Sequence, residues 1–497
     1  MAKGLLQCLK VYFRVNSNNS YLLFVSGLMI TSCLLSACVE KKMSLQEAKQ
    51  VAISFSDQSY TPPPRRINDI LSVLEQSGSY DQKILQKLQA QADAVPQAGK
   101  QPTASFYKDR GIAAVELGRV LQGLRDFREA YRLMQEAGAR DMRIEIELGI
   151  HEAQCGNLKR SITVFEEHLG HPQKIGMAYW YLLRAYARLG DFANAEDVRK
   201  RGIAYYNSID RRSVSLRNPY VIMNHSLLEY LYLSIQGKHE EAEPFIRKAL
   251  AQGVRLKHEF PRGPIFTRRW LSGNLKYQGR LVEAEVEARQ VVRDAIALGG
   301  KKSYHTYAAV QSLGEILLSQ RRLEDAQKLF NFVVTTMVNI GISEDSYDLS
   351  QARIALGDAL AAGGNFNAAM GQYKRSREAL VKNRFIYTSI YERNPQVIYS
   401  HIMTGNFNEA LALIDRAYQR LTEILTPDNE QVVELLAMRG LVYAKQGNIE
   451  GAYQAFSDSV PLFLAMERDG KDFKARKRWD SMLVAYADVC AQLRGTP

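Results

Sequence analysis

Cysteine and the familiar catalytic signatures are scarce in this sequence. Only five cysteines occur in 497 residues, no Cys-x-x-Cys pair is present, and the eight histidines form no zinc-binding helical motif. Phosphate loops and the Gly-x-Ser-x-Gly elbow of hydrolases are missing as well. The sequence therefore offers no catalytic residue, no metal ligand and no cofactor site, and we expect a protein that is not an enzyme.

Long apolar runs are equally rare, and the one candidate lies near the N-terminus. Residues 21–35 are largely apolar, but this stretch is shorter than the roughly 20 residues that a membrane-spanning helix needs. Lys3, Lys10 and Arg14 precede it without any acidic residue, and it ends in Leu35-Ser36-Ala37-Cys38. A basic leader, an apolar segment and small residues are typical of a secretory signal, so residues 1–37 are predicted to be removed.

The residues before Cys38 resemble the bacterial lipoprotein signal. That resemblance implies cleavage just before Cys38 and attachment of acyl chains such as palmitate to this cysteine, which would anchor the protein to a membrane. An ordinary signal peptide, or a short anchor with a chance cysteine, is the alternative. Val39 rather than Asp follows the cysteine, which in well-studied Gram-negative lipoproteins implies the outer membrane. We therefore expect a lipid-anchored protein of the bacterial cell envelope that faces the periplasm.

An internal repeat dominates the rest of the chain. Near-identical hexamers stand at residues 364–369, 405–410 and 447–452. Glycine ends a helix without strain, an Asn or Asp after it caps the next helix, and a small residue follows where two helices cross. The same frame recurs at intervals of 34 to 47 residues, mostly about 42. The nine turn positions are Gly118, Gly156, Gly190, Gly237, Gly279, Arg321, Gly364, Gly405 and Gly447.

A second glycine stands seven residues before five of these turns, at Gly111, Gly149, Gly314, Gly357 and Gly440. The Leu-Gly pair, the turn glycine, the alanine and the following aromatic residue together resemble the tetratricopeptide repeat (TPR), over residues 105–463. The resemblance implies an all-α, right-handed TPR superhelix of about nine helical hairpins. Most units exceed the minimal length of about 34 residues, so we expect longer helices and a deep groove.

The flanking segments complete the predicted domain organisation. Residues 1–37 are the signal, 38–104 a tether and N-terminal helical cap, 105–463 the solenoid, and 464–497 a C-terminal capping helix. Apolar stripes in 66–76 and 81–95 predict a hairpin that covers the first repeat, because terminal repeats need a cap. The basic start of the last helix, from Lys471 to Arg478, is either a solvated face, which we favour, or an acidic docking patch.

The concave groove is the expected functional surface. In TPR proteins, fixed positions of the first helix of each hairpin face the ligand. Mapped onto this chain, they are Trp180, Arg184, Arg188, Asn224, Arg269, Lys276, Tyr277, Gln311 and Glu315. Arginines beside aromatic residues suit a peptide with acidic and apolar groups, although each residue could instead be an ordinary exposed one. The chaperone-type carboxylate clamp is not supported, because Lys108 is followed by Ile112 rather than by Asn.

Charge favours the same kind of partner. The net charge is +12, and it falls to +9 without residues 1–37, which carry three basic residues and no acid. A basic surface can bind nucleic acid, but no nucleic-acid fold signature appears and export would remove access to it. We therefore expect a protein or peptide partner, with acidic character an option, and no nucleic acid.

The chain as a whole resembles the front half of bacterial lipoproteins that join TPR repeats to a caspase-like CHAT protease domain. The catalytic His and Cys of that protease have no match here, so no catalytic residue is carried over. We expect a lipid-anchored interaction scaffold that binds a peptide or partner domain in its groove. Two alternatives stay open: the sensing half of a CHAT protease whose domain is missing or acts in trans, and an assembly factor of an envelope or secretion machine.

Overall fold

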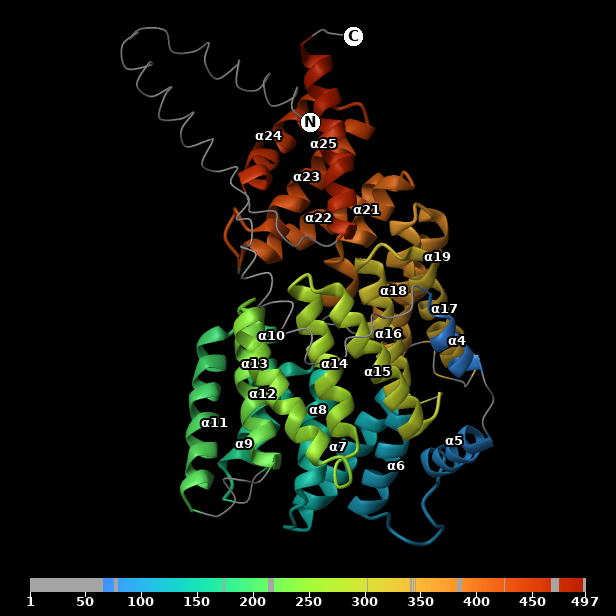
Figure 1. Cartoon of the computed structure of the whole chain (residues 1–497), viewed down its shortest axis with the longest axis vertical. Helices are drawn as coiled ribbons and strands as arrows, with labels where there is room; N and C mark the ends of the chain where they lie inside the picture. Colours follow the sequence, from blue (N-terminus) through green and yellow to red (C-terminus); the bar gives the residue numbers. More distant parts are fainter. Residues whose placement is uncertain are drawn as a thin grey trace, which may run out of the picture. The chain divides into compact units, whose positions relative to one another are not determined.

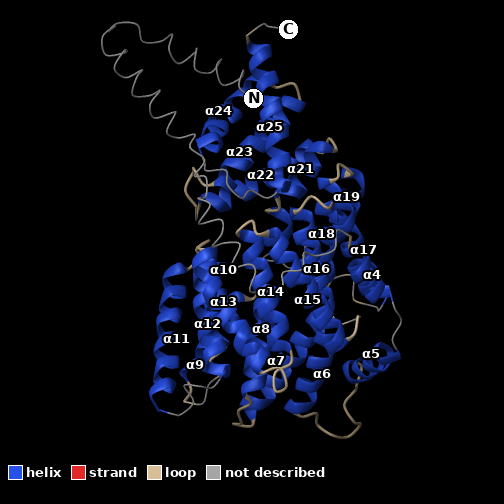
Figure 2. Ribbon diagram, viewed as in Figure 1, coloured by secondary structure: helices blue, strands red, loops and turns tan. Residues whose placement is uncertain are grey.

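The computed structural model describes residues 66–75, 79–172, 175–212, 219–301, 303–339, 342, 344, 346–381, 387–423, 425–465 and 473–494. The predicted signal, Cys38 and the tether lie outside the described residues. Residues Pro63–Pro497 form one compact unit. Among the described residues there is no strand (Figure 2), and none of the described helices has the length and apolar character needed to cross a membrane.

Nine helical hairpins follow one another along the chain (Figure 1). Their helices pair as α6 (Ala104–Glu116) with α7 (Val120–Glu136), α8 (Met142–Gln154) with α9 (Leu158–Gly170), α10 (Ala178–Leu189) with α11 (Phe192–Arg212), α12 (Pro219–Ile235) with α13 (His239–Arg255), α14 (Arg262–Tyr277) with α15 (Leu281–Gly299), α16 (Tyr304–Ser319) with α17 (Leu323–Asn339), α18 (Tyr347–Ala362) with α19 (Phe366–Leu380), α21 (Pro395–Met403) with α22 (Phe407–Thr422), and α23 (Glu430–Lys445) with α24 (Ile449–Ala465). The predicted all-α repeat superhelix is confirmed.

The nine predicted turn positions have left-handed backbone conformations. The eight glycines have φ between 73° and 87°, and Arg321 has φ 65°. Arg321 is the one non-glycine residue with positive φ in the described part of the chain. An arginine therefore adopts the geometry that glycine adopts elsewhere, at a cost of about 1–2 kcal/mol, because the hairpin around it imposes the turn.

The second glycine of the repeat has a packing role. A Cβ on Gly149 would lie 2.5 Å from the ring of Phe165, and one on Gly357 would lie 2.5 Å from the ring of Tyr373. The aromatic residue of the second helix thus rests directly on the backbone of the first. This contact explains why the glycine and the aromatic residue occur together in the repeat.

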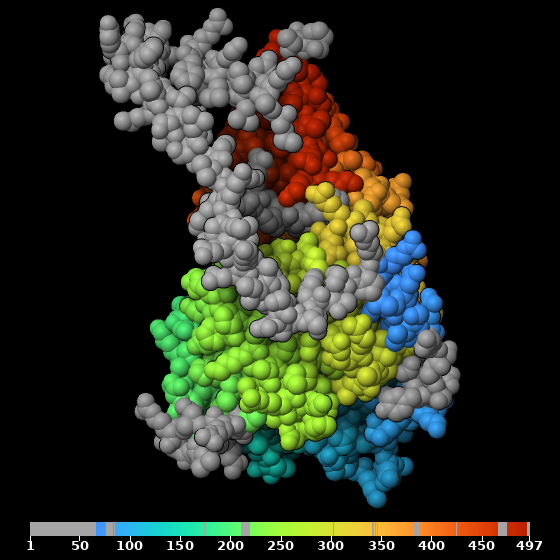
Figure 3. Space-filling view, viewed as in Figure 1, coloured from blue at the N-terminus to red at the C-terminus, as the bar shows by residue number. Residues whose placement is uncertain are grey.

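The N-terminal cap differs from the expected hairpin. Helix α5 (Ser79–Ala92) packs on α6 as expected. Helix α4 (Asn68–Glu75) instead lies on α15 (Figure 3), where Arg289 donates to Asp69 at 2.6 Å and to the Arg66 carbonyl at 3.1 Å. The expectation that α4 covers the first repeat was wrong. The buried Arg289 of α15 binds Asp69 of α4, 220 residues earlier in the chain, and so holds α4 on α15.

The last helix, α25 (Phe473–Leu493), packs against α23 and α24 as predicted. It also reaches α21 and the end of α18. Arg478 donates to Glu434 at 2.8 Å and to Gln396 at 2.9 Å, and Lys477 donates to the Ala362 carbonyl at 2.8 Å. For Arg478 and Lys477 the expected solvated face was wrong, because these cations bind acceptors on neighbouring helices.

The first hairpin contacts repeats far along the chain. Ser346, before α18, donates to the Gly118 carbonyl at 3.3 Å, and Arg262, at the start of α14, pairs with Glu116 at 2.6 Å. Ile342 lies against Gly118 so closely that a Cβ there would be 2.6 Å from its Cδ1. We call Glu116, Gly118, Arg262, Ile342 and Ser346 the clasp. In an open solenoid each repeat touches only its neighbours, so the clasp closes one turn of this superhelix.

Candidate functional site

The first helices of neighbouring hairpins line the inside of the superhelix. Contacts join α8 to α10, α10 to α12, α14 to α16 and α16 to α18. Because the elements of a curved stack come closest on its concave side, these helices form the inner layer. The predicted groove residues all lie on α10, α12, α14 and α16.

A cavity of about 190 Å³ opens in this inner layer between α14, α16, α17 and α18. Three predicted groove residues, Arg269, Gln311 and Glu315, line it. The other lining residues are Tyr304, Tyr307, Ala308, Ser312, Val333, Met337, Asp348 and Gln351. The structure therefore gathers part of the predicted set around one small polar cavity.

Arg184 lies close to this cavity and has no carboxylate partner. Its guanidinium stands 5.8 Å from the ring centroid of Trp270, and it makes no hydrogen bond or ion pair with another described residue. The side chain is exposed to solvent. Even so, the pKa of Arg184 is lowered, mainly because the surrounding protein desolvates the guanidinium and also because Arg269 repels it. Arg184 thus stands on the inner layer beside another cation, Arg269.

Arg188 and Arg269 extend this basic surface. Arg188 donates to the Ala153 carbonyl at 2.8 Å, and burial lowers its pKa. Arg269 is half-buried, and its guanidinium has no hydrogen bond or ion pair with the described residues. Its neighbour Arg268, by contrast, pairs with Glu287 at 2.7 Å. We call Arg184, Arg188 and Arg269 the inner basic site.

Asp348 and Glu315 are the two carboxyl groups of the cavity, and Asp348 is the buried one. Its side chain is buried at 9% exposure, and its Oδ2 has no hydrogen-bond partner among the described residues. Burial raises the pKa of this carboxyl to about 7, and the nearby Arg269 opposes the increase. A carboxyl in this state exchanges its proton near neutral pH.

Two predicted groove residues are part of the core instead. Trp180 and Asn224 are 4% and 2% exposed, and the Trp180 Nε1 donates to the Asn224 Oδ1 at 3.1 Å. Trp180 also meets Trp270 edge-on at 5.6 Å between ring centroids. The expectation that these two face a partner was wrong in this conformation, because side chains of α12 and α14 cover them.

The remaining predicted residues lie at the rim. Lys276 pairs with Glu315 at 3.2 Å, and Tyr277, 64% exposed, stacks on His239 at 4.8 Å between centroids. Lys276 therefore has its charge compensated within the protein. Whether these residues contact a partner stays a prediction.

Tyr304, Tyr347 and Asp348 were missed by the sequence reasoning. Tyr304 is the first residue of α16, and Tyr347 and Asp348 are the first two residues of α18. The repeat pattern predicted turn and packing positions in these hairpins, but it did not predict groove residues at the helix starts. Ser346 caps α18 by accepting from the Leu349 amide at 3.5 Å. This Ser, recognisable as a helix start, was the available signal for the two residues that follow it.

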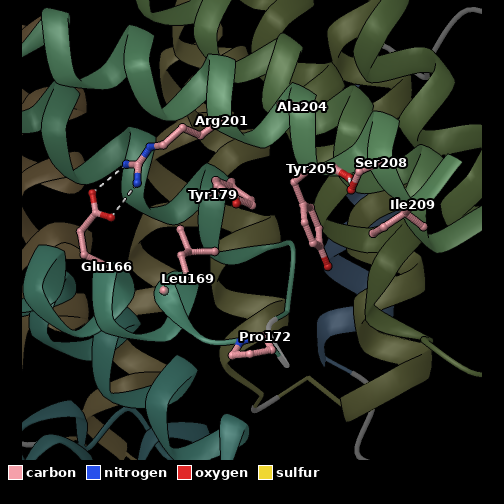
Figure 4. Close-up of a pocket in the computed structure, with 10 residues that line it drawn as sticks. Glu166, Leu169, Pro172, Tyr179, Arg201, Ala204, Tyr205, Ser208 and Ile209 are labelled. Carbon is pink, nitrogen blue, oxygen red and sulfur yellow. Dashed lines mark hydrogen bonds and ion pairs between the residues drawn. The ribbon is translucent and has the colours of Figure 1, made fainter. Parts of the chain in front are cut away.

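A second, larger cavity of about 840 Å³ lies between α9, α10 and α11 (Figure 4). Figure 4 shows Arg201 paired with Glu166, at 2.8 Å, beside the rings of Tyr179 and Tyr205. No predicted groove residue lines it. Because its arginine already has a carboxylate partner, the inner basic site is the stronger candidate for binding an anionic group.

No family model matches the chain, and no curated protein matches it. It is similar to a Rap protein complexed with competence and sporulation factor, at TM-score 0.44 and 12% identity over 72% of this chain and 97% of that one. It is also similar to a human IFIT1 dimer with PPP-AAAA, at TM-score 0.36 and 12% identity over 80% and 100% of the two chains.

A third similar structure is a putative kinesin light chain of Podosopora anserina with nearly identical TPR-like repeats. The TM-score is 0.33 and the identity 13%, over 40% of this chain and 93% of that one. At such identities and scores, the three likenesses say nothing about a shared ligand. The nine hairpins, their left-handed turns and their inner layer make this chain an all-α solenoid with a TPR-type fold.

Proposed function

We propose that this chain is a protein-interaction scaffold that captures an acidic segment of a partner protein on its inner basic site. The observation that carries the proposal is that neither Arg184 nor Arg269, both on the inner layer, forms an ion pair with a described carboxylate. Arg269 is half-buried, where an uncompensated cation is unfavourable, and repulsion between it and Arg184 adds to that cost. A bound anion would compensate these two.

The chemistry of the site suits a peptide carboxylate. A guanidinium presents a planar fork of donors that matches a carboxylate with two parallel hydrogen bonds. Trp270, Tyr304 and Tyr347 lie around the arginines, and aromatic side chains supply much of the contact energy in protein interfaces. An acidic residue next to an apolar one would therefore satisfy both kinds of group.

Labelled short peptides test this proposal. One library combines acidic and aromatic residues, and a matched library replaces each acid by its amide. We expect the full chain to bind the acidic library, more weakly as salt increases. Arg184→Glu with Arg188→Glu should abolish that binding. The control, Lys248→Glu with Lys328→Glu, reverses two exposed charges on second helices and should bind like the wild type. Equal binding by both double variants would refute the site.

We also propose that the scaffold is held in the bacterial envelope by acyl chains on Cys38, on the periplasmic side of the outer membrane. This proposal rests on the leader sequence alone. The mass of the native protein, extracted with detergent, tests it. A mass of residues 38–497 plus acyl groups supports the anchor, and Cys38→Ala should then release the protein from membranes. An unmodified Cys38 would overturn the anchor, whereas a mass larger by a domain would favour the sensing half of a protease.

A further inference from the structure

Two opposite charges line the cavity of the inner layer without contacting each other. Arg269 comes from α14 and Asp348 from α18. No hydrogen bond or ion pair joins them, and neither side chain bonds with any other described residue. A cation and an anion that share a small cavity usually pair directly. Here a gap separates them.

Three other polar groups of the cavity wall have partners, among them its second carboxylate, Glu315. Ser312 donates to the Ala308 carbonyl at 2.9 Å, Gln351 donates to the Tyr347 hydroxyl at 2.7 Å, and Glu315 pairs with Lys276. Buried polar groups in native proteins are nearly always hydrogen-bonded, and an exception calls for a physical explanation. Of the three charged residues in this wall, Arg269 and Asp348 are the two without a partner among the described residues.

The burial of Asp348 makes the gap costly. Only 9% of the residue is exposed, and its Oδ2 is fully enclosed. An ionised carboxylate in such a place is unfavourable unless a donor or a cation reaches it. Arg269 acts on it only at a distance. A positively charged group that entered the cavity would satisfy Asp348, and its negatively charged end would satisfy Arg269.

The dimensions of the cavity limit the ligand. Its volume is about 190 Å³, and an apolar protein cavity of roughly 150 Å³ holds one benzene molecule. The occupant is thus a small molecule. Ala308, Val333 and Met337 make part of the wall apolar, which leaves room for a short aliphatic portion between or beside the charged ends.

We propose that this cavity binds a small zwitterion of the amino-acid class, with its ammonium against Asp348 and its carboxylate against Arg269. This inference goes beyond the proposed function, since a free zwitterion and an acidic peptide are different ligands. Both ligands would use Arg269, but the peptide also depends on Arg184 and Arg188, whereas the zwitterion alone depends on Asp348. The scaffold would then sense a small metabolite within the same layer that holds its protein partner.

Calorimetric titration of the full chain with each standard amino acid tests the inference. We expect at least one to bind. Two relatives of the best ligand should bind about tenfold more weakly or worse: the amine that lacks its carboxylate, and the acid that lacks its ammonium. If no amino acid binds, or if the amine and the acid bind as well as the zwitterion, the proposal is wrong.

Variants connect the ligand to the two charges. Asp348→Asn keeps the shape of the side chain and should weaken binding of the amino acid about tenfold or more, as should Arg269→Gln. Glu378→Gln, which removes an exposed carboxylate on α19, should bind as the wild type does. Asp348→Asn should still bind the acidic peptide library. Undiminished amino-acid binding by Asp348→Asn would overturn the inference and leave the proposed function untouched.

Discussion

The inner layer of this solenoid is covered by an additional helix in the last hairpins, whereas it contains a cavity between α14 and α18. Along the last hairpins, α25 lies against α21 and α23, and its Arg478 pairs with Glu434 while its Ser481 bonds with Tyr399 at 2.7 Å. Helix α25 also contacts α16, but between α14 and α18 the inner layer keeps a cavity lined by Arg269 and Asp348, neither of which has an ion pair among the described residues. Where α25 packs on the inner layer, charged residues such as Glu434 pair with residues of the chain itself. Where it does not, Arg269 and Asp348 have no partner among the described residues.

Buried carboxylates show the same contrast. Glu392, 0% exposed, is bound by Arg416, by Arg420 at 3.1 Å and by the Thr388 hydroxyl at 3.0 Å. Asp348 has no such partner. We infer that Glu392 serves stability and that Asp348 is retained at a cost to stability. Two predictions test this difference, and two more test the clasp and the inner basic site, in order of decreasing effect.

Glu392→Gln should have the largest effect. It leaves two arginines, each about one-third exposed, facing a neutral amide. Breaking a buried ion pair from one side is strongly destabilising, and partial exposure of the arginines reduces the loss to about 2–4 kcal/mol. Denaturant unfolding measures it. The exposed Glu378→Gln should stay within about 0.5 kcal/mol of the wild type, and a similar loss in both would end the distinction.

Asp348→Asn should stabilise the protein, and more so at alkaline pH. The pKa of Asp348 is raised from 3.8 to about 7, so its contribution to stability is fully present below about pH 4 and is lost as the pH rises through 7. The variant lacks this loss. Its advantage should be roughly 2–4 kcal/mol at pH 8 and clearly smaller at pH 5, as thermal unfolding at both pH values would show. An advantage that does not change with pH would contradict the assignment.

Alanine at two turn glycines should separate the clasp from an ordinary turn. Gly118 and Gly405 have φ of 73° and 77°, so both variants carry the left-handed penalty of about 1–2 kcal/mol. Only at Gly118 would the new Cβ collide, with Ile342 at 2.6 Å. Gly118→Ala should therefore be less stable than Gly405→Ala by about 1 kcal/mol or more. Equal denaturation midpoints would mean that the clasp does not hold in solution.

Arg184→Gln should have the smallest effect on stability. The side chain is exposed and lacks an ion pair in the described structure, so its loss should change the free energy of unfolding by no more than about 0.5 kcal/mol. Urea titration is sufficient to measure this. A loss above about 1 kcal/mol would show that Arg184 supports the fold, and the contrast with the paired arginines of the last hairpins would then fail.

The sequence by itself determined the repeat, its nine turns and the helix type. These features are local: a left-handed turn, a small residue at a helix crossing and an aromatic ring on a glycine leave a fixed spacing in the chain. The same spacing located Arg269, Gln311 and Glu315 on one cavity wall. It misassigned Trp180 and Asn224, because the repeat positions do not show which neighbouring side chains cover a residue.

Only the tertiary structure decided where charges meet. The clasp, the anchoring of α4 by Arg289 and the insertion of α25 join residues that are between 44 and 228 positions apart. The approach of Arg269 and Asp348 to one cavity is of the same kind. Such contacts depend on the total curvature, to which every repeat adds a small rotation. A local sequence pattern does not specify this total. The repeat therefore determines the architecture, whereas the contacts between distant repeats determine which charges are paired and which are not.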